Sequence, residues 1–104
     1  FALPSLDEPW GLAVNEAMAC GTAVISTDQC GCSVDLVDDS VGRSVPADDC
    51  DALAVALTEV LADPITTATM GRAAQNRIAT WSYAEDITGL KAALKVVGEM
   101  PFLT

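Results

Sequence analysis

Residues 1–31, FALPSLDEPWGLAVNEAMACGTAVISTDQCG, decide the fold of this chain. A short apolar run at 1–3 is followed by a loop at 7–11, a stretch of small apolar residues that ends at Gly21, and an apolar, β-branched stretch at 22–26. This order predicts a strand, a helix and a second, buried parallel strand. Because ligands of open parallel sheets bind at the carboxyl ends of the strands, the loop at 7–11 is the candidate ligand loop.

Two carboxylates stand in this stretch, Glu8 in the loop and Glu16 in the predicted helix. Between them, Gly11 allows a ligand to approach the backbone, and the start of a helix offers free N–H groups and a partial positive charge that favour a phosphate. At a rise of ~1.5 Å per residue, Glu16 lies about 7–8 Å further along the axis. We therefore expect a diphosphate at the helix start, with one of its neighbouring groups beside Glu8 and another beside Glu16.

An ordered set of short motifs runs through most of the chain: Glu8-Pro9-Trp10-Gly11-Leu12, Asn15 to Gly21, Val24 to Ser26, Gly31, Asp35 to Val37, Gly42, Pro46, Leu53, Asp63-Pro64, Met70-Gly71 and Trp81-Ser82. This set resembles family 4, or group 1, of the retaining glycosyltransferases. The most specific part is a glutamate that is followed, after seven residues, by Glu-Ala-Met-Ala-x-Gly. Those enzymes have two Rossmann-like domains that face each other across a cleft, and the signature lies in the second, donor-binding domain.

The resemblance implies an α/β fold with a Rossmann-like, three-layer parallel sheet, the C-terminal half of a two-domain B-type architecture. The chain starts at Phe1, in what reads as the middle of a strand. We therefore expect residues 1–104 to be a single partial domain that lacks its N-terminal partner domain. In the family, the last helical stretch crosses back to that partner, so residues 82–104 are predicted to brace it.

The resemblance also implies the site residues. Glu8 is the candidate catalytic residue and accepts hydrogen bonds from hydroxyls of the donor sugar. Glu16 accepts hydrogen bonds from the ribose of the donor. The diphosphate would bind backbone N–H groups of the segment that Pro9 opens, namely those of Trp10, Gly11 and Leu12. Without the resemblance, the two glutamates read as ordinary solvated acids on a helix, where the dipole favours them near its start.

A second loop, at 27–31, is expected at the same sheet edge, facing the same ligand. In this loop Gly31 keeps the first of two glycines that are usual in the family, and Cys32 replaces the second, which adds a Cβ where the loop would approach the donor. Asp35 either holds the loop in place or merely opens a short helix. That helix is predicted at 33–37 with Ser33 as its cap.

The remainder of the chain predicts three helices, each with a start or stop signal. The first is capped by Asp48 or Asp49 and ends at Asp63-Pro64, the second runs from Thr66 or Thr67 to Ile78, and the third opens with the capping box Ser82 to Glu85. Asp49-Cys50-Asp51 also matches the Asp-x-Asp metal motif of a different glycosyltransferase architecture. Capping alone explains these acids, so no metal site is expected.

Charge and cysteine content exclude several classes of protein. The net charge is −10, from five Lys and Arg against fifteen Asp and Glu, which opposes binding to nucleic acid or to anionic lipid. It also counts against a diphosphate bound by this chain alone, and the resemblance implies that an upstream Arg and Lys neutralise the phosphates. There is no His, and Cys30-x-Cys32 is too closely spaced for a usual zinc knuckle, so free thiols are expected.

These observations predict an enzyme, a glycosyltransferase of hexosyltransferase type, whose donor domain we have here. It would take a sugar from a nucleotide diphosphate donor, with retention, to a saccharide, lipid or small-molecule acceptor, without a cofactor. It is expected to be cytoplasmic, or peripheral to the membrane through the missing domain, and the fragment alone is expected to be inactive. The alternative hypothesis is a non-catalytic module derived from such an enzyme, which binds nucleotide sugar or forms a homodimer through an open sheet edge.

Overall fold

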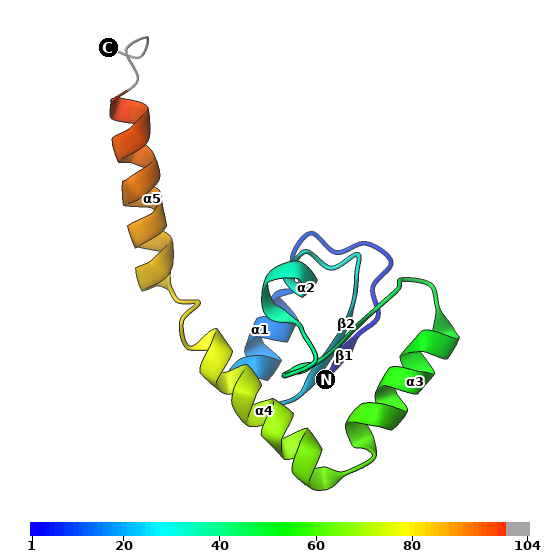
Figure 1. Ribbon diagram of the computed structural model, residues 1–104. Helices are drawn as coiled ribbons and strands as arrows, with labels where there is room; N and C mark the ends of the chain where they lie inside the picture. Colours follow the sequence, from blue (N-terminus) through cyan, green and yellow to red (C-terminus); the bar gives the residue numbers. More distant parts are fainter. Residues whose placement is uncertain (100–104) are drawn as a thin grey trace.

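The computed structural model describes residues 1–99 and is built around a three-stranded parallel sheet (Figure 1). Its strands are β1 (Ala2–Leu3), β2 (Val24–Thr27) and β3 (Gly42–Val45), and β2 lies between the other two. Ala2 pairs with Ile25. The predicted parallel pairing is confirmed, but β2 begins two residues later than predicted. The reason is that the N–H of Thr22 donates to the carbonyl of Ala17 and so closes the preceding helix instead of joining the sheet.

The described residues form five helices: α1 (Leu12–Ala19), α2 (Gly31–Leu36), α3 (Cys50–Leu61), α4 (Pro64–Ile78) and α5 (Tyr83–Gly98). In Figure 1, α1 and α2 lie on one side of the sheet, α3 lies on the other, and α4 runs beneath both. Residues 100–104, which end the predicted bracing segment 82–104, lie outside the described residues.

Two apolar clusters, one on each face of the sheet, hold the layers together. Adjacent strand residues point to opposite faces, so Val24 joins the cluster of α1 and α2, and Ile25 joins the cluster of α3. Helix α4 contributes to both, with Ala74 in the first cluster and Met70 in the second. This arrangement confirms the predicted α/β class with a three-layer parallel sheet.

Glycines flank helix α1, and the one after its carboxyl end lies against α4. At its carboxyl end Gly21 has a φ of 75°, which favours glycine, and it ends the helix as predicted. A Cβ added to Gly71 of α4 would lie 2.0 Å from the carbonyl oxygen of Gly21. Gly71 weakens α4 as an isolated helix, yet it is what allows α4 to pack directly against the end of α1.

Two predicted helix caps are confirmed, and two predicted helix starts are wrong. Asp49 caps α3 through the N–H of Ala52, and the capping box of Ser82 and Glu85 is present at the start of α5. Helix α4 begins at Pro64 and not at Thr66 or Thr67, because Asp63 caps it and proline fits the first helical turn. Helix α2 begins at Gly31, and Ser33 lies inside it rather than capping it.

The hydroxyl of Ser33 has a different role from the predicted one. It is buried, donates to the carbonyl of Thr27 at 2.6 Å and lies 2.5 Å from the hydroxyl of Ser26. The Ser33 side chain thus joins helix α2 to the end of β2. Cys30 occupies the cap position of α2, but its side chain accepts no hydrogen bond from the first turn of the helix.

Helix α5 leaves the body of the molecule and carries no buried residue (Figure 1). Its large apolar side chains are exposed, with Ile87, Leu90 and Leu94 each more than half accessible. Within residues 1–99, no single helix has the length and apolar character needed to cross a membrane. Only α3 and α4 taken together, across a 99° bend, pass by length and composition.

Candidate donor-binding site

Two loops lie side by side at the carboxyl ends of β1 and β2. The N–H of Glu8 donates to the carbonyl of Gln29 at 3.1 Å, and the N–H of Gly31 donates back to the carbonyl of Glu8 at 3.0 Å. Further along, the N–H of Cys32 donates to the carbonyl of Trp10 at 2.9 Å. The prediction that the second loop lies at the same edge as the first is therefore confirmed.

Gly31 is required where these loops touch. A Cβ at this position would lie 2.1 Å from the carbonyl oxygen of Pro9, closer than real Cβ contacts allow. Cys32 is fully buried, and its Sγ lies under Gly11, so its Cβ does not face the open side of the loop. Burial is also the main reason that the pKa of the Cys32 thiol is raised to about 11, which keeps it neutral. In this chain the two positions serve the packing of loop against loop.

Thr27, at the end of β2, is a structural residue of the site that the sequence did not single out. Its side chain is 2 % exposed, and its hydroxyl donates to the carbonyl of Ser5 at 2.6 Å and accepts from the N–H of Gln29 at 3.3 Å. It thereby fixes the start of the first loop to the second. A β-branched residue with a hydroxyl at the end of an apolar strand was the only available signal.

The start of α1 is open. Its cap is Gly11, whose φ of 96° favours glycine and whose lack of a side chain leaves the helix without a side-chain cap. A Cβ there would also approach Leu3 and Cys32 at 3.0 and 3.2 Å. The first N–H groups of the helix thus have no side-chain oxygen to bind, and together with the dipole they favour an anion.

Glu8 lies half-buried directly before this helix start. One of its carboxylate oxygens accepts from the N–H of Trp10 at 3.4 Å, which is at the weak end of hydrogen-bond lengths. The indole Nε1 of Trp10 donates to the side-chain oxygen of Asn15 at 2.8 Å, and its ring stacks on Trp81, with centroids 5.7 Å apart. Leu12, at the first position of the helix, is exposed.

Glu16 lies on the exposed side of α1 and lines a hollow of about 620 Å³ between α1 and the junction of α4 and α5. The residues that line it are Trp10, Leu12, Asn15, Glu16, Ala19, Ile78, Trp81, Ser82, Tyr83 and Asp86. Glu8 is not among the residues that line this hollow. That Glu8 and Glu16 bind one ligand together stays a prediction. Asp35 is exposed on α2 and does not line the hollow beside α1.

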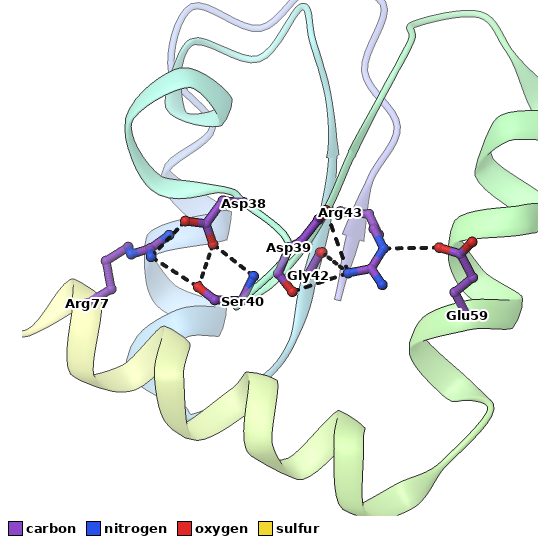
Figure 2. A network of polar contacts seen from close by, with 7 residues as sticks. All are labelled: Asp38, Asp39, Ser40, Gly42, Arg43, Glu59 and Arg77. Carbon is purple, nitrogen blue, oxygen red and sulfur yellow. Dashed lines mark hydrogen bonds and ion pairs between the residues drawn. The ribbon is translucent and has the colours of Figure 1, made fainter.

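The ion pairs within residues 1–99 lie away from the two loops of the candidate site (Figure 2). Arg77 of α4 binds Asp38 at 2.9 Å, and Arg43 of β3 binds Glu59 of α3 at 3.0 Å. Hydrogen bonds from Arg77 and Ser40 lower the pKa of the Asp38 carboxyl to about 2. The first pair joins α4 to the turn before β3, and the second joins α3 to β3 itself. The two loops of the candidate site contain no Lys or Arg.

Asp49, Cys50 and Asp51 lie at the start of α3. The carboxylate of Asp49 is used as a helix cap, accepting from the N–H of Ala52 at 2.9 Å. In the part of the chain that the structure describes, no three His, Cys, Asp or Glu side chains converge as metal ligands would. The four cysteines are free, Cys20 and Cys50 at the surface and the other two in the interior.

Comparison with known proteins decides the family. The family model described as "Glycosyl transferases group 1" matches residues 1–77, about three quarters of the chain. The chain belongs to this family. The resemblance carried by the motif from Glu8 to Gly21 is thereby confirmed. The family to which this group 1 chain belongs is a family of enzymes, the glycosyltransferases.

Curated relatives of this group 1 chain carry specific names. It is 41 % identical over 90 residues to the D-inositol 3-phosphate glycosyltransferase of Mycolicibacterium gilvum, covering 86 % of this chain and 20 % of that protein. It is 36 % identical over 97 residues to the alpha-maltose-1-phosphate synthase of Mycobacterium tuberculosis, covering 85 % of this chain and 25 % of that protein. The group 1 chain thus spans a fifth to a quarter of the length of these relatives.

A solved structure agrees with the fold. The sucrose-phosphate synthase of Thermosynechococcus elongatus superposes with a TM-score of 0.76 at 34 % identity, covering 92 % of this chain and 25 % of that one. This similarity extends past the residues that the family model matches, so part of the α4–α5 region of the group 1 chain is included.

Proposed function

We propose that this chain is the donor-binding half of a retaining glycosyltransferase, which binds a nucleotide diphosphate sugar at the Glu8 loop and transfers the sugar to an acceptor. One observation carries the proposal: Glu8 stands at the carboxyl end of β1, directly before the uncapped start of α1. A carboxylate suited to sugar hydroxyls and a helix start suited to phosphate are therefore neighbours in the chain and in space.

The chemistry follows from these neighbours. The N–H groups at the start of α1 and the helix dipole would stabilise the negative charge that develops on the departing diphosphate. Glu8 would hold the sugar through its hydroxyls, which fixes the reacting carbon relative to the acceptor. Its 3.4 Å contact with the N–H of Trp10 is weak, so a ligand can replace it and use both groups.

Glu16 supports the same donor from the other side of Trp10. It is exposed on α1, faces the hollow beside that helix, and would accept hydrogen bonds from the ribose hydroxyls. Since no basic side chain lies in the two loops, the charge of the diphosphate has to be balanced by cations from the remainder of a longer enzyme. We therefore place the second wall of the cleft, and the acceptor site, in a domain outside this chain.

The acceptor class is the broadest part of the proposal. One relative is named as a glycosyltransferase of D-inositol 3-phosphate and another as a synthase whose product is alpha-maltose-1-phosphate, which supports a small polyhydroxylated acceptor over a protein. A lipid acceptor is supported in the same way by a relative named phosphatidyl-myo-inositol mannosyltransferase, which is 45 % identical over 56 residues.

The test uses the full-length enzyme that contains this chain, with Glu8→Gln, Glu16→Gln and Asp51→Asn as separate variants. Asp51 is an exposed carboxylate on α3 and serves as the control. A hydrogen bond to a charged group contributes about 1.5–3 kcal/mol, so each glutamate variant should lower kcat/KM for the donor by roughly tenfold to a hundredfold. Transfer by Glu8→Gln within a factor of two of the wild type would remove the site assignment.

Two further measurements separate this function from its alternatives. The anomeric configuration of the product, followed by NMR, should match that of the donor sugar, and inversion would contradict a retaining enzyme. The isolated residues 1–104 should bind the donor weakly and show no transfer. A non-catalytic module instead predicts binding without turnover in the full-length protein as well.

A further inference from the structure

Two tryptophans, from distant parts of the chain, stack beside the candidate site. Trp10 belongs to the Glu8 loop, and Trp81 lies in the short connection between α4 and α5. Their ring centroids are 5.7 Å apart, and their planes differ by 29°. The backbone N–H of Trp81 donates to the carbonyl of Ile78 at 3.0 Å, so this connection is held to the end of α4.

Trp10 is the residue through which the loop is fixed on its open side. Its carbonyl accepts from the N–H of Cys32, its own N–H reaches the carboxylate of Glu8 at 3.4 Å, and its indole Nε1 binds Asn15 at 2.8 Å. A single hydrogen bond thus links the backbone of Trp10 to the carboxylate of Glu8. The Trp10 ring is held by the hydrogen bond to Asn15, by the stack on Trp81 and by packing against the apolar cluster of α1 and α2.

We propose that Trp81 is a positioning residue for the Glu8 loop: by stacking on Trp10, it keeps the N–H of Trp10 and the Glu8 carboxylate in the geometry that binds the donor. This inference rests on the proposed function of Glu8. Trp81 lies beyond residues 1–77, which the family model matches, and the resemblance that includes Trp81-Ser82 gives this side chain no role. As a consequence, a shift of the α4–α5 connection would displace the donor loop, because the stacked rings of Trp10 and Trp81 join the two segments.

The inference differs from simple surface packing in a measurable way. If the stack were only packing, loss of Trp81 would lower the melting temperature and leave donor affinity unchanged. If Trp81 acts through Trp10, its loss should weaken donor binding, and this effect should vanish once the Trp10 ring is already absent. Non-additivity of this kind is expected only for residues that share an interaction.

The experiment uses the full-length enzyme with Trp81→Ala, Trp81→Phe, Trp10→Ala and the double alanine variant. UDP-glucose, GDP-mannose and ADP-glucose are titrated calorimetrically into the wild type, and the tightest binder serves as the probe. Ile65→Ala is the control, since Ile65 is an exposed apolar residue of α4 that does not line the hollow beside Trp10. Melting temperatures and KM values for donor and acceptor are measured for every variant.

The expected result follows from the strength of an aromatic pair. Trp81→Ala should weaken donor binding by about threefold to tenfold and raise the donor KM with the acceptor KM unchanged. Trp81→Phe, which keeps a ring for stacking, should stay within about twofold of the wild type, as should Ile65→Ala. The double variant should bind the donor as Trp10→Ala does, within about twofold.

Three results would overturn the inference alone: wild-type donor affinity in Trp81→Ala, additive losses in the double variant, or a loss in Trp81→Phe equal to that in Trp81→Ala. In each of these cases the effect of Glu8→Gln on transfer would still support the proposed function. A wild-type enzyme that binds none of the three nucleotide sugars would overturn both.

Discussion

Replacing Gly31 by alanine tests the contact between the two loops on which the candidate site is built. The added Cβ would lie 2.1 Å from the carbonyl oxygen of Pro9, whereas real Cβ atoms essentially never approach closer than 3.0 Å. The neighbouring atom belongs to the backbone of Pro9, so no flexible side chain can move aside. The loops would have to separate by roughly 1 Å, which already removes much of the attraction at their contact.

The cost of that separation is set by the hydrogen bonds at the contact. The bond from Gly31 to Glu8 measures 3.0 Å and the bond from Cys32 to Trp10 measures 2.9 Å, so both would exceed hydrogen-bond length. Each contributes about 0.5–1.5 kcal/mol, and overpacking of an ordered region adds about 1–3 kcal/mol. We expect the free energy of unfolding to fall by about 2–6 kcal/mol in total.

The assay is thermal and urea unfolding of the wild-type chain, Gly31→Ala and Gly89→Ala. For a chain of about this size, the expected loss lowers the melting temperature by about 10 °C or more. Gly89 is the matched control, because a Cβ on this glycine of α5 would meet nothing within 4 Å. Alanine there should stabilise the helix by up to about 1 kcal/mol. Gly31→Ala melting within about 2 °C of the wild type would refute the reasoning.

Three other outcomes are expected. The pKa of Asp38 is lowered in the folded state, so its carboxylate stabilises the protein above the unfolded value near 3.8, and this contribution is lost as the pH falls through about 2. Asp38→Asn should therefore cost at most about 1 kcal/mol at pH 7, since the pair with Arg77 is solvent-exposed. The free energy of unfolding of this variant should depend less on pH between pH 4 and 2 than that of the wild type, and an unchanged dependence would contradict this prediction. Asp49→Ala should cost about 1 kcal/mol in urea unfolding and Asp51→Ala less, with no recovery on adding Mn²⁺, whereas recovery would favour a cation site. Under native conditions at pH 7 a thiol reagent should modify Cys20 and Cys50 while the two buried thiols react only after denaturation, and four fast thiols in the native protein would contradict the burial.

The local part of the structure could be predicted from the sequence. The order of strands and helices from Phe1 to Ile78 follows from apolar periodicity, and the caps at Asp49 and Ser82 follow from side chains that bond their own first turn. The family could be recognised too, because Glu8 and the motif that starts at Glu16 stand at a fixed separation along the chain. Each of these features depends on residues that are close in sequence.

The contacts between distant segments could not be predicted in this way. Gly31 is needed because the backbone of Pro9 passes within 2.1 Å of where a Cβ would stand, and Ser33 failed as a cap because its hydroxyl finds the carbonyl of Thr27 in the interior. Likewise, no local pattern pairs Trp10 with Trp81.

The amino-acid sequence by itself determined which segments become strands and helices, and it placed two carboxylates, with seven residues between them, around an open helix start. Only the tertiary structure decided that Glu16 faces the hollow beside α1 while Glu8 lies outside it, held against the second loop. The physical reason is that local bonding selects backbone conformation, whereas the direction and surroundings of a side chain depend on which distant segments pack beside it.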